Sequence, residues 1–102
     1  MAVFEVFSAA VYDHATSRIE VMAWLHQENE LFTLSKSATW NLFQEGNEVA
    51  IASATQATAN KRMHAVLSNV VISPDKLYFL ETTVVDNNDV PHKIGSALAT
   101  LD

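Results

Sequence analysis

Hydrophobic and polar residues alternate with a period of two along most of this chain, which is the pattern of β-strands that bury one face. The alternating segments are rich in β-branched and aromatic residues, which suit the surface of a pleated sheet. In residues 18–26, for example, one face carries Ile19, Val21, Ala23 and Leu25. The pattern therefore predicts an all-β protein.

Turn-forming residues divide the alternating segments at the spacings typical of sandwiches and barrels. Clear examples are residues 13–17, 45–47 and 86–89, whereas residues 53–60 fit either a helical turn or a loop. The pattern predicts seven strands, at residues 3–12, 18–26, 37–45, 48–53, 62–71, 77–86 and 91–100.

Composition narrows the class of protein further. The chain has 102 residues, 49% of them hydrophobic, which suits a single domain over residues 1–102 with one core. Cysteine is absent, the first residues read as a strand rather than a signal peptide, and no apolar run reaches the roughly 18 residues of a membrane helix. A net charge of −6 argues against nucleic-acid and membrane partners. We expect a protein kept in the cytoplasm where it is made.

The segment from Ile72 to Tyr78 contains an apolar residue, a proline turn at Pro74 and a tyrosine that enters a strand. This is the order of a tyrosine corner, in which the tyrosine ring is buried and its hydroxyl bonds to backbone a few residues upstream. The spacing resembles the signature before the sixth strand of fibronectin type III domains. This resemblance covers the last third of the chain and implies an immunoglobulin-like, seven-stranded Greek-key β-sandwich.

The two tryptophans leave the subtype of such a sandwich open. Trp24 lies in the second predicted strand, where fibronectin domains place theirs, and Trp40 lies in the third, where immunoglobulin domains place theirs. The cysteine pair of immunoglobulin domains is absent. We assign a structural role to Ile72, Pro74, Tyr78 and Trp40.

The order of features also resembles small immunoglobulin-like proteins of tailed bacteriophage particles. The resemblance lies in an apolar first strand, the central segment 38–49 and the strand that begins near Tyr78. Such proteins decorate capsids or build necks, tails and fibres. The resemblance implies a virion component, made in the host cytoplasm, whose partners are other virion proteins or further copies of itself.

Residues that could support catalysis are scattered along the chain. The four histidines, His14, His26, His64 and His92, have no metal-ligand spacing, and we interpret them as exposed structural residues. There is no nucleophile elbow and no glycine-rich phosphate loop. We therefore expect no enzymatic activity, no metal and no cofactor.

Two groups of acidic residues have a chemical and a structural interpretation. The turn at residues 86–89 offers oxygen ligands of the kind calcium prefers, but aspartate and asparagine also form turns for backbone reasons alone, and we favour that reading. Glu20 and Glu81 would make a glycosidase pair only if the fold brought them together. We favour the interpretation that they lie on solvated sheet faces.

Several predicted strands are apolar on both faces, whereas a two-sheet sandwich buries only one face of each sheet. Met22 and Trp24 lie opposite the Ile19 face of their strand, Phe4 lies in the first strand, and Phe79 lies opposite Tyr78. One interpretation is that loops and strand ends cover these groups. The other is that Trp24, Met22, Phe4 and Phe79 form an interface for docking or self-association.

Three functions are compatible with this sequence. The first is a non-enzymatic structural protein of a tailed-phage virion, such as a capsid decoration, neck or tail accessory protein. The second is a module that binds carbohydrate or protein through its aromatic residues. The third is a small acidic inhibitor of a bacterial defence complex, although a charge of −6 is mild for a mimic of nucleic acid.

Overall fold

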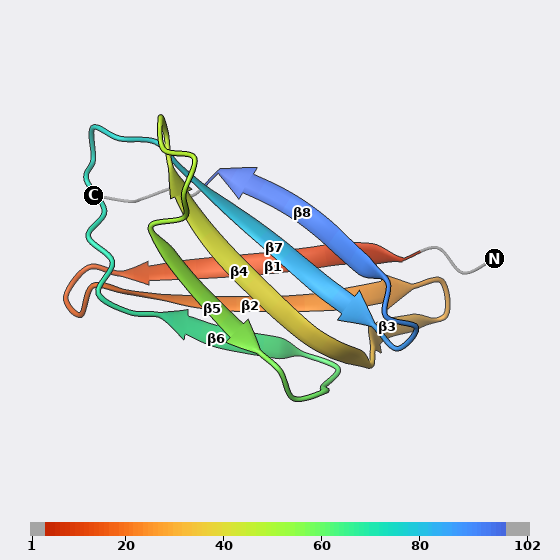
Figure 1. The fold of residues 1–102 in the computed structure, drawn as a ribbon. Helices are drawn as coiled ribbons and strands as arrows, with labels where there is room; N and C mark the ends of the chain where they lie inside the picture. Colours follow the sequence, from red (N-terminus) through yellow and green to blue (C-terminus); the bar gives the residue numbers. More distant parts are fainter. Residues whose placement is uncertain (1–3, 98–102) are drawn as a thin grey trace.

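The computed structural model describes residues 4–97, which form two antiparallel four-stranded sheets packed face to face (Figure 1). Sheet A contains β1 (Glu5–Asp13), β2 (Arg18–Gln27), β3 (Glu30–Thr33) and β6 (Met63–Leu67). Sheet B contains β4 (Ser35–Gln44), β5 (Ala52–Gln56), β7 (Tyr78–Asp86) and β8 (Pro91–Ala97). The prediction of an all-β chain is confirmed, and within residues 4–97 no helix is long and apolar enough to cross a membrane.

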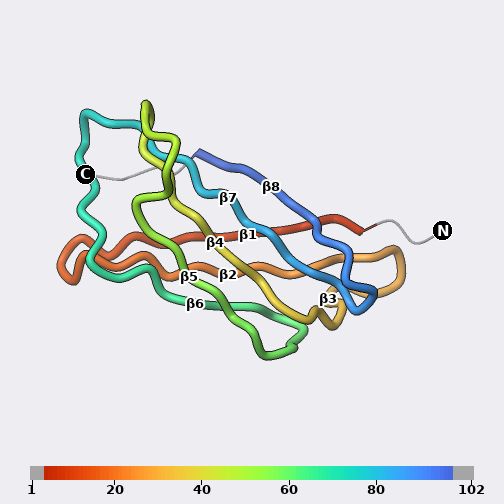
Figure 2. Tube along the Cα trace, in the orientation of Figure 1, coloured from red at the N-terminus to blue at the C-terminus, as the bar shows by residue number. Residues whose placement is uncertain are grey.

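The long strand β2 organises sheet A. Along one edge it pairs with β1, and along the other it pairs with β6 and, nearer its end, with β3. In sheet B the strand order is β5-β4-β7-β8. Figure 2 shows sheet B lying across sheet A at an angle, with β8 beside β1 and β5 beside β6, which closes the two long sides of the molecule.

The described residues form eight strands rather than the predicted seven. The additional strand, β3, continues directly from β2 through a turn at Glu28 and Asn29, where the sequence had indicated only a polar break. The fourth predicted strand, at residues 48–53, is also displaced, because β5 begins only at Ala52. The connection before it is a seven-residue loop, residues 45–51, whose second residue is Gly46 at a φ of 88°.

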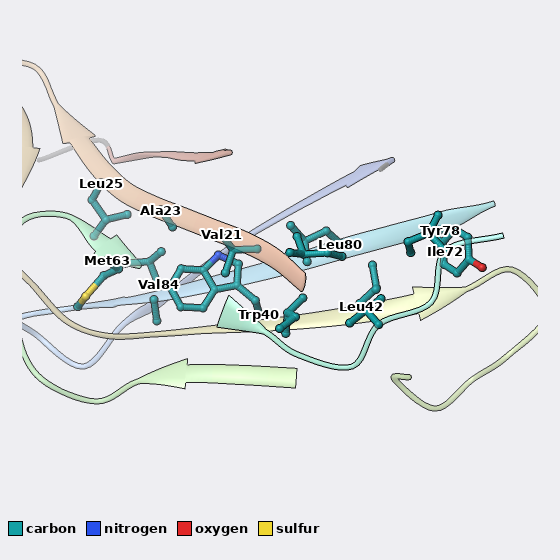
Figure 3. Close-up of a cluster of buried hydrophobic side chains, with 14 residues drawn as sticks. Val21, Ala23, Leu25, Trp40, Leu42, Met63, Ile72, Tyr78, Leu80 and Val84 are labelled. Atoms are coloured by element: carbon teal, nitrogen blue, oxygen red, sulfur yellow. The ribbon is translucent and has the colours of Figure 1, made fainter. Parts of the chain in front are cut away.

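The core lies between the sheets and is built from the alternating residues of the strands (Figure 3). Trp40 in β4 is fully buried, and its indole lies beside Val21 of β2. Burying a large side chain of this kind contributes roughly 2–3 kcal/mol to folding. The buried apolar residues are Ile19, Val21, Ala23, Leu25, Ala38, Trp40, Leu42, Met63, Leu67, Val70, Ile72, Tyr78, Leu80 and Val84.

The long connection between β6 and β7, residues 68–77, closes one end of the core. Val70 and Ile72 point inward, and the Val70 N–H donates to the Ser17 carbonyl at 2.8 Å, which fastens the connection to the β1–β2 turn. The Tyr78 ring is buried, and its hydroxyl accepts a hydrogen bond of 3.0 Å from the Ser73 N–H. This contact has the geometry expected of a tyrosine corner.

Candidate functional site

The outer face of sheet A carries side chains in three rows that run across the strands. The pairing of β1 with β2 places Phe7 opposite Trp24, Ala9 opposite Met22 and Val11 opposite Glu20. Residues that are paired in an antiparallel sheet point to the same side, so each pair belongs to one row. The pairing of β2 with β6 extends the second row by His64 and the third by Val66.

The first row is a ridge of aromatic rings, which we call the aromatic ridge: Phe7, Trp24 and Phe32. The Phe7 and Trp24 rings stack at 5.7 Å with an interplanar angle of 14°, and Phe32 lies 5.7 Å from Trp24 at 56°. The Arg62 guanidinium lies over the Phe32 ring at 4.3 Å from its centroid, within the range of a cation–π contact. These contacts hold the ridge in place on the sheet.

Beside the ridge the face is hollowed, because Ala9 is small and lies between larger neighbours. The hollow has a volume of about 380 Å³. Its lining is mostly apolar, with Glu20, Arg62 and His64 as the titratable groups, and it consists of Ala9, Val11, Glu20, Val21, Met22, Arg62, His64, Ala65 and Val66. Phe7, Met22 and Val11 are 39%, 42% and 65% exposed, so this face presents apolar side chains to solvent.

The outer face of sheet B is different, because its central side chains are polar and bond to one another. The hydroxyls of Thr39 and Thr55 lie 3.1 Å apart, and the Ser53 hydroxyl donates to the Asn41 amide oxygen at 2.6 Å. One end of this face is apolar, where the pairing places Phe43, Phe79 and Ala97 in one row.

The structure separates the four residues predicted to form one interface. Trp24 and Met22 share the outer face of sheet A, whereas Phe79, 48% exposed, lies on the opposite side of the molecule. Phe4 packs against the core, so its assignment to an outer face is wrong. The outward aromatic residue of the first strand is Phe7, because its pairing with Trp24 fixes which face of β1 points outward.

Of the residues predicted to be structural, Ile72, Pro74 and Tyr78 lie at the end of the core that the β6–β7 connection closes, and Trp40 lies in the middle of the core (Figure 3). Trp40, Tyr78 and Ile72 are buried, and Pro74 is exposed in the turn between Ile72 and Tyr78. The indole Nε1 of Trp40 and the hydroxyl of Thr82, its cross-strand neighbour, have no hydrogen-bond partner among residues 4–97. The core of sheet B therefore contains two unpaired polar atoms.

A buried carboxylate at the β7–β8 turn is a feature that the sequence analysis missed. Asp86 is 3% exposed, and its carboxylate accepts the N–H groups of Asn88 and Val90 at 2.8 and 3.1 Å. The same carboxylate lies 2.8 Å from His92 Nε2. The hydrogen bond to His92 holds the pKa of Asp86 below its ordinary value, and the two backbone bonds act in the same direction against the effect of burial. The alternation of inward and outward residues from Tyr78 to Asp86 could have indicated this burial, because it places Asp86 on the inner face of its strand.

This arrangement also corrects two expectations. His92 is only 20% exposed at its side chain and lies 5.0 Å from the Phe4 ring, and His26 is half-buried in β2 rather than exposed in a turn. Asp86 uses its oxygens within the turn, as the structural interpretation of residues 86–89 proposed. Among residues 4–97 no group of three or more histidine and acidic side chains is placed to hold a metal ion.

The other candidate acidic pair is kept apart by the two sheets. Glu20 lies on the outer face of sheet A, and Glu81 lies on the outer face of sheet B, 3.7 Å from Lys93 Nζ. The two carboxylates therefore do not form a paired catalytic site. Comparison with protein-family models, with curated proteins and with solved structures found no match to this chain.

Proposed function

We propose that this protein is a non-enzymatic interaction module that docks onto a protein surface through the outer face of sheet A. The observation that carries this proposal is the continuous apolar face made by the aromatic ridge, Met22 and Val11, with Arg62 at one side. Aromatic residues, methionine and arginine are enriched in the centres of protein interfaces. The centre of the outer face of sheet B is polar and internally bonded, and its aromatic residues, Phe43 and Phe79, lie at one end.

The proposed fold family is the immunoglobulin-like Greek-key sandwich. Without the short β3, the first, second and fifth strands of the chain form one sheet, and the third, fourth, sixth and seventh form the other. Immunoglobulin domains divide strands A, B and E from strands C, F and G in the same way. The hydrogen bond from Ser73 to Tyr78 supports the same assignment.

The proposed setting is the particle of a tailed bacteriophage, where the protein serves as a capsid decoration, neck or tail accessory protein. This part of the proposal is supported by the sequence pattern described above, in the apolar first strand, residues 38–49 and the strand from Tyr78. In a symmetric particle a modest contact is repeated many times, so multivalency turns it into firm attachment.

Protein is a better ligand class for this face than carbohydrate. A sugar platform needs exposed ring faces, but Phe7 and Trp24 turn their faces toward each other. Of the other rings, Trp40 and Tyr78 are buried in the core and Tyr12 packs against it. The stacked ridge offers ring edges and aliphatic neighbours, which suit the side chains of a second protein.

The test compares Trp24→Ser on the outer face of sheet A with Phe79→Ser on the outer face of sheet B. Quantitative mass spectrometry of purified particles should find the wild-type chain and the Phe79 variant, and should find the Trp24 variant reduced at least about tenfold. Circular dichroism of the free variants checks that both are folded. Equal incorporation of the two variants would exclude the proposed docking face, and absence of the wild-type chain from particles would exclude the virion setting.

A further inference from the structure

We propose that the free edge of β1 accepts an extended segment of a partner protein, which adds to sheet A as a further strand. This site is separate from the proposed docking role, which uses the outer face of sheet A and needs no added strand. Among residues 4–97, β1 is the last strand on its side of the sheet and pairs only with β2. About half of its nine residues therefore direct their backbone N–H and C=O groups away from β2, where another strand can bond to them.

Of the edge strands in residues 4–97, β1 has the longest regular edge. It pairs with β2 without a bulge, it contains no proline, and its charged residues, Glu5 and Asp13, lie only at its two ends. The strands β3, β5 and β6 have four or five residues, and β8 begins with Pro91. Proteins protect exposed edges with short strands, prolines, bulges and charges. The middle of β1 has none of these devices and is therefore a template for another strand.

On the β1 side of the sandwich, β8 closes the core only in part. It approaches the start of β1 where His92 meets Phe4, and it diverges from β1 farther along the sheet (Figure 1). Ser96 of β8 faces inward, because it pairs with the buried Leu80, and yet it is exposed.

The inward side chains of β1 show the same incomplete cover. The inward residues of the neighbouring β2 are fully buried, whereas those of β1 are only partly buried, namely Val6, Ser8, Ala10 and Tyr12. A strand added beside β1 would place alternate side chains over this margin of the core. The backbone groups and the side chains of β1 therefore point to the same occupant, an extended segment.

The pattern of β1 specifies which segment fits. Apolar residues at alternate positions of the segment would face the core, beside the small side chains of Ser8 and Ala10. Basic residues at its two ends would lie opposite Glu5 and Asp13, and cross-strand pairs of opposite charge are stabilising. Glu5 is the stronger of the two sites, because Asp13 already lies opposite Arg18 in β2. The net charge of −6 also attracts a basic segment.

The same charges disfavour a second copy of this chain as the occupant. Antiparallel pairing of two β1 strands over their whole length is centred on Ala9, so it would place Glu5 of each copy directly opposite Asp13 of the other. Like charges that lie directly opposite each other in a sheet are destabilising. We therefore assign the edge to a segment of a different protein, with alternating apolar residues and basic ends.

The probe is the end-blocked synthetic peptide Lys-Val-Thr-Val-Thr-Val-Thr-Val-Lys, which places valine toward the core and lysine opposite the two acidic residues of β1. Nuclear magnetic resonance of the full chain should detect binding with a dissociation constant below about 1 mM. Hydrogen exchange should slow at least about tenfold at alternate amides of β1, because only the N–H groups that point away from β2 gain a partner. A control peptide with glutamate in place of both lysines should bind at least about tenfold more weakly.

A pair of matched variants locates the binding on the chain. Ser8→Lys points a charge inward at the free edge, which is one of the devices that block edge pairing, and it should weaken peptide binding at least about tenfold. Ser53→Lys makes the same change in the edge strand β5 of sheet B and should leave binding unchanged. Circular dichroism checks that both variants are folded, and the two peptides compare binding in the wild-type chain without any change of its sequence.

Absence of binding at about 1 mM peptide, or binding that leaves exchange of the β1 amides unchanged, would overturn the proposed strand addition. Removal of residues 98–102 should leave binding unchanged, and binding that appears only in this shortened chain would assign the edge to the chain's own end instead. Trp24→Ser should bind the peptide as the wild type does. A chain that is incorporated into particles through Trp24 but does not bind the peptide would exclude the added strand and leave the docking face in place.

Discussion

The outer faces of the two sheets present different kinds of side chain to solvent. On sheet B the strands present threonine, serine and asparagine side chains that form hydrogen bonds across the strands. The centre of this face is therefore polar. On sheet A the equivalent positions carry Phe7, Met22 and Trp24, and the rings stack on one another while leaving apolar edges exposed. A sandwich needs only one buried face for each sheet.

Exposed apolar side chains also lie in loops and at one end of sheet B, but on the outer face of sheet A Phe7, Val11 and Met22 lie on neighbouring strands together with Trp24. Single exposed apolar side chains occur on every protein surface and carry no information, whereas a continuous group on one sheet and a bonded polar group on the other indicate separate roles. Four predictions test whether the roles differ in this way, in order from the largest expected effect to the smallest.

The largest effect is expected from a charge placed in the middle of the aromatic ridge. Trp24→Lys should weaken the docking of this protein onto its protein partner at least about 100-fold. The change removes an interface anchor and leaves a buried charge without a partner. Asn41→Lys, at a matched central position on sheet B, should leave association unchanged. Recovery of both variants with purified particles provides the measurement, and equal recovery of the two would remove the distinction between the faces.

The second prediction concerns the buried carboxylate that stabilises sheet B. Asp86→Asn should lower the free energy of unfolding by about 2 kcal/mol at neutral pH, because it weakens charge-assisted bonds to His92 and two backbone N–H groups. The pKa of Asp86 is lower in the folded chain than its ordinary value of 3.8, so its contribution is complete above that pH and is lost as the pH falls through the folded value.

The measurement is urea denaturation of both chains between pH 7 and pH 2. The difference between wild type and variant should shrink as the pH falls below about 4. A difference that grows below that pH would contradict the sign of the pKa shift. The outer face of sheet A has no comparable anchor, so variants there should show no such pH dependence.

Removal of a buried polar group that has no hydrogen-bond partner should raise the free energy of unfolding, whereas removal of a bonded one should lower it. Thr82 is fully buried in sheet B, and its hydroxyl has no hydrogen-bond partner among residues 4–97. Thr82→Val keeps the shape of the side chain and removes the unpaired hydroxyl, so it should raise the free energy of unfolding by about 1 kcal/mol. Thermal denaturation checks this, with Thr83→Val on the outer face as the control, which should change stability little.

The smallest effect is expected for the cross-strand bonds on the polar face. Asn41→Ala and Ser53→Ala should each lower the free energy of unfolding by about 0.5 kcal/mol, and the double variant should lose less than the sum of the two, because both share one hydrogen bond. Chemical denaturation of the wild type, the two single variants and the double variant measures these differences. None of these variants should change the docking of this protein onto its partner. A change would show that sheet B also takes part in docking.

Much of the fold follows from local pattern. The alternation in β2, β4 and β7 identified these segments as strands. The segment from Ile72 to Tyr78 indicated the buried tyrosine and the backbone contact of its hydroxyl. These features depend on residues close together in the chain, where the period of two and the turn chemistry decide the outcome.

Other features depended on how one strand pairs with its neighbour. In β1 both faces are apolar, so the pattern could not decide between Phe4 and Phe7, and only the register with β2 turned Phe7 outward. The pairing of Asp86 with His92 and the short strand β3 were missed for the same reason, because each is fixed by a neighbour across a turn rather than by its own pattern.

The sequence by itself determined that this chain folds as antiparallel strands around a core that includes Trp40 and Tyr78, because burial of alternating apolar residues leaves few other arrangements for it. Only the tertiary structure decided that Phe7, Trp24 and Phe32 meet on one face while the polar side chains meet on the other. The physical reason is that a surface is assembled across strands, and a shift of register by one residue would turn each of these side chains to the opposite side of its sheet.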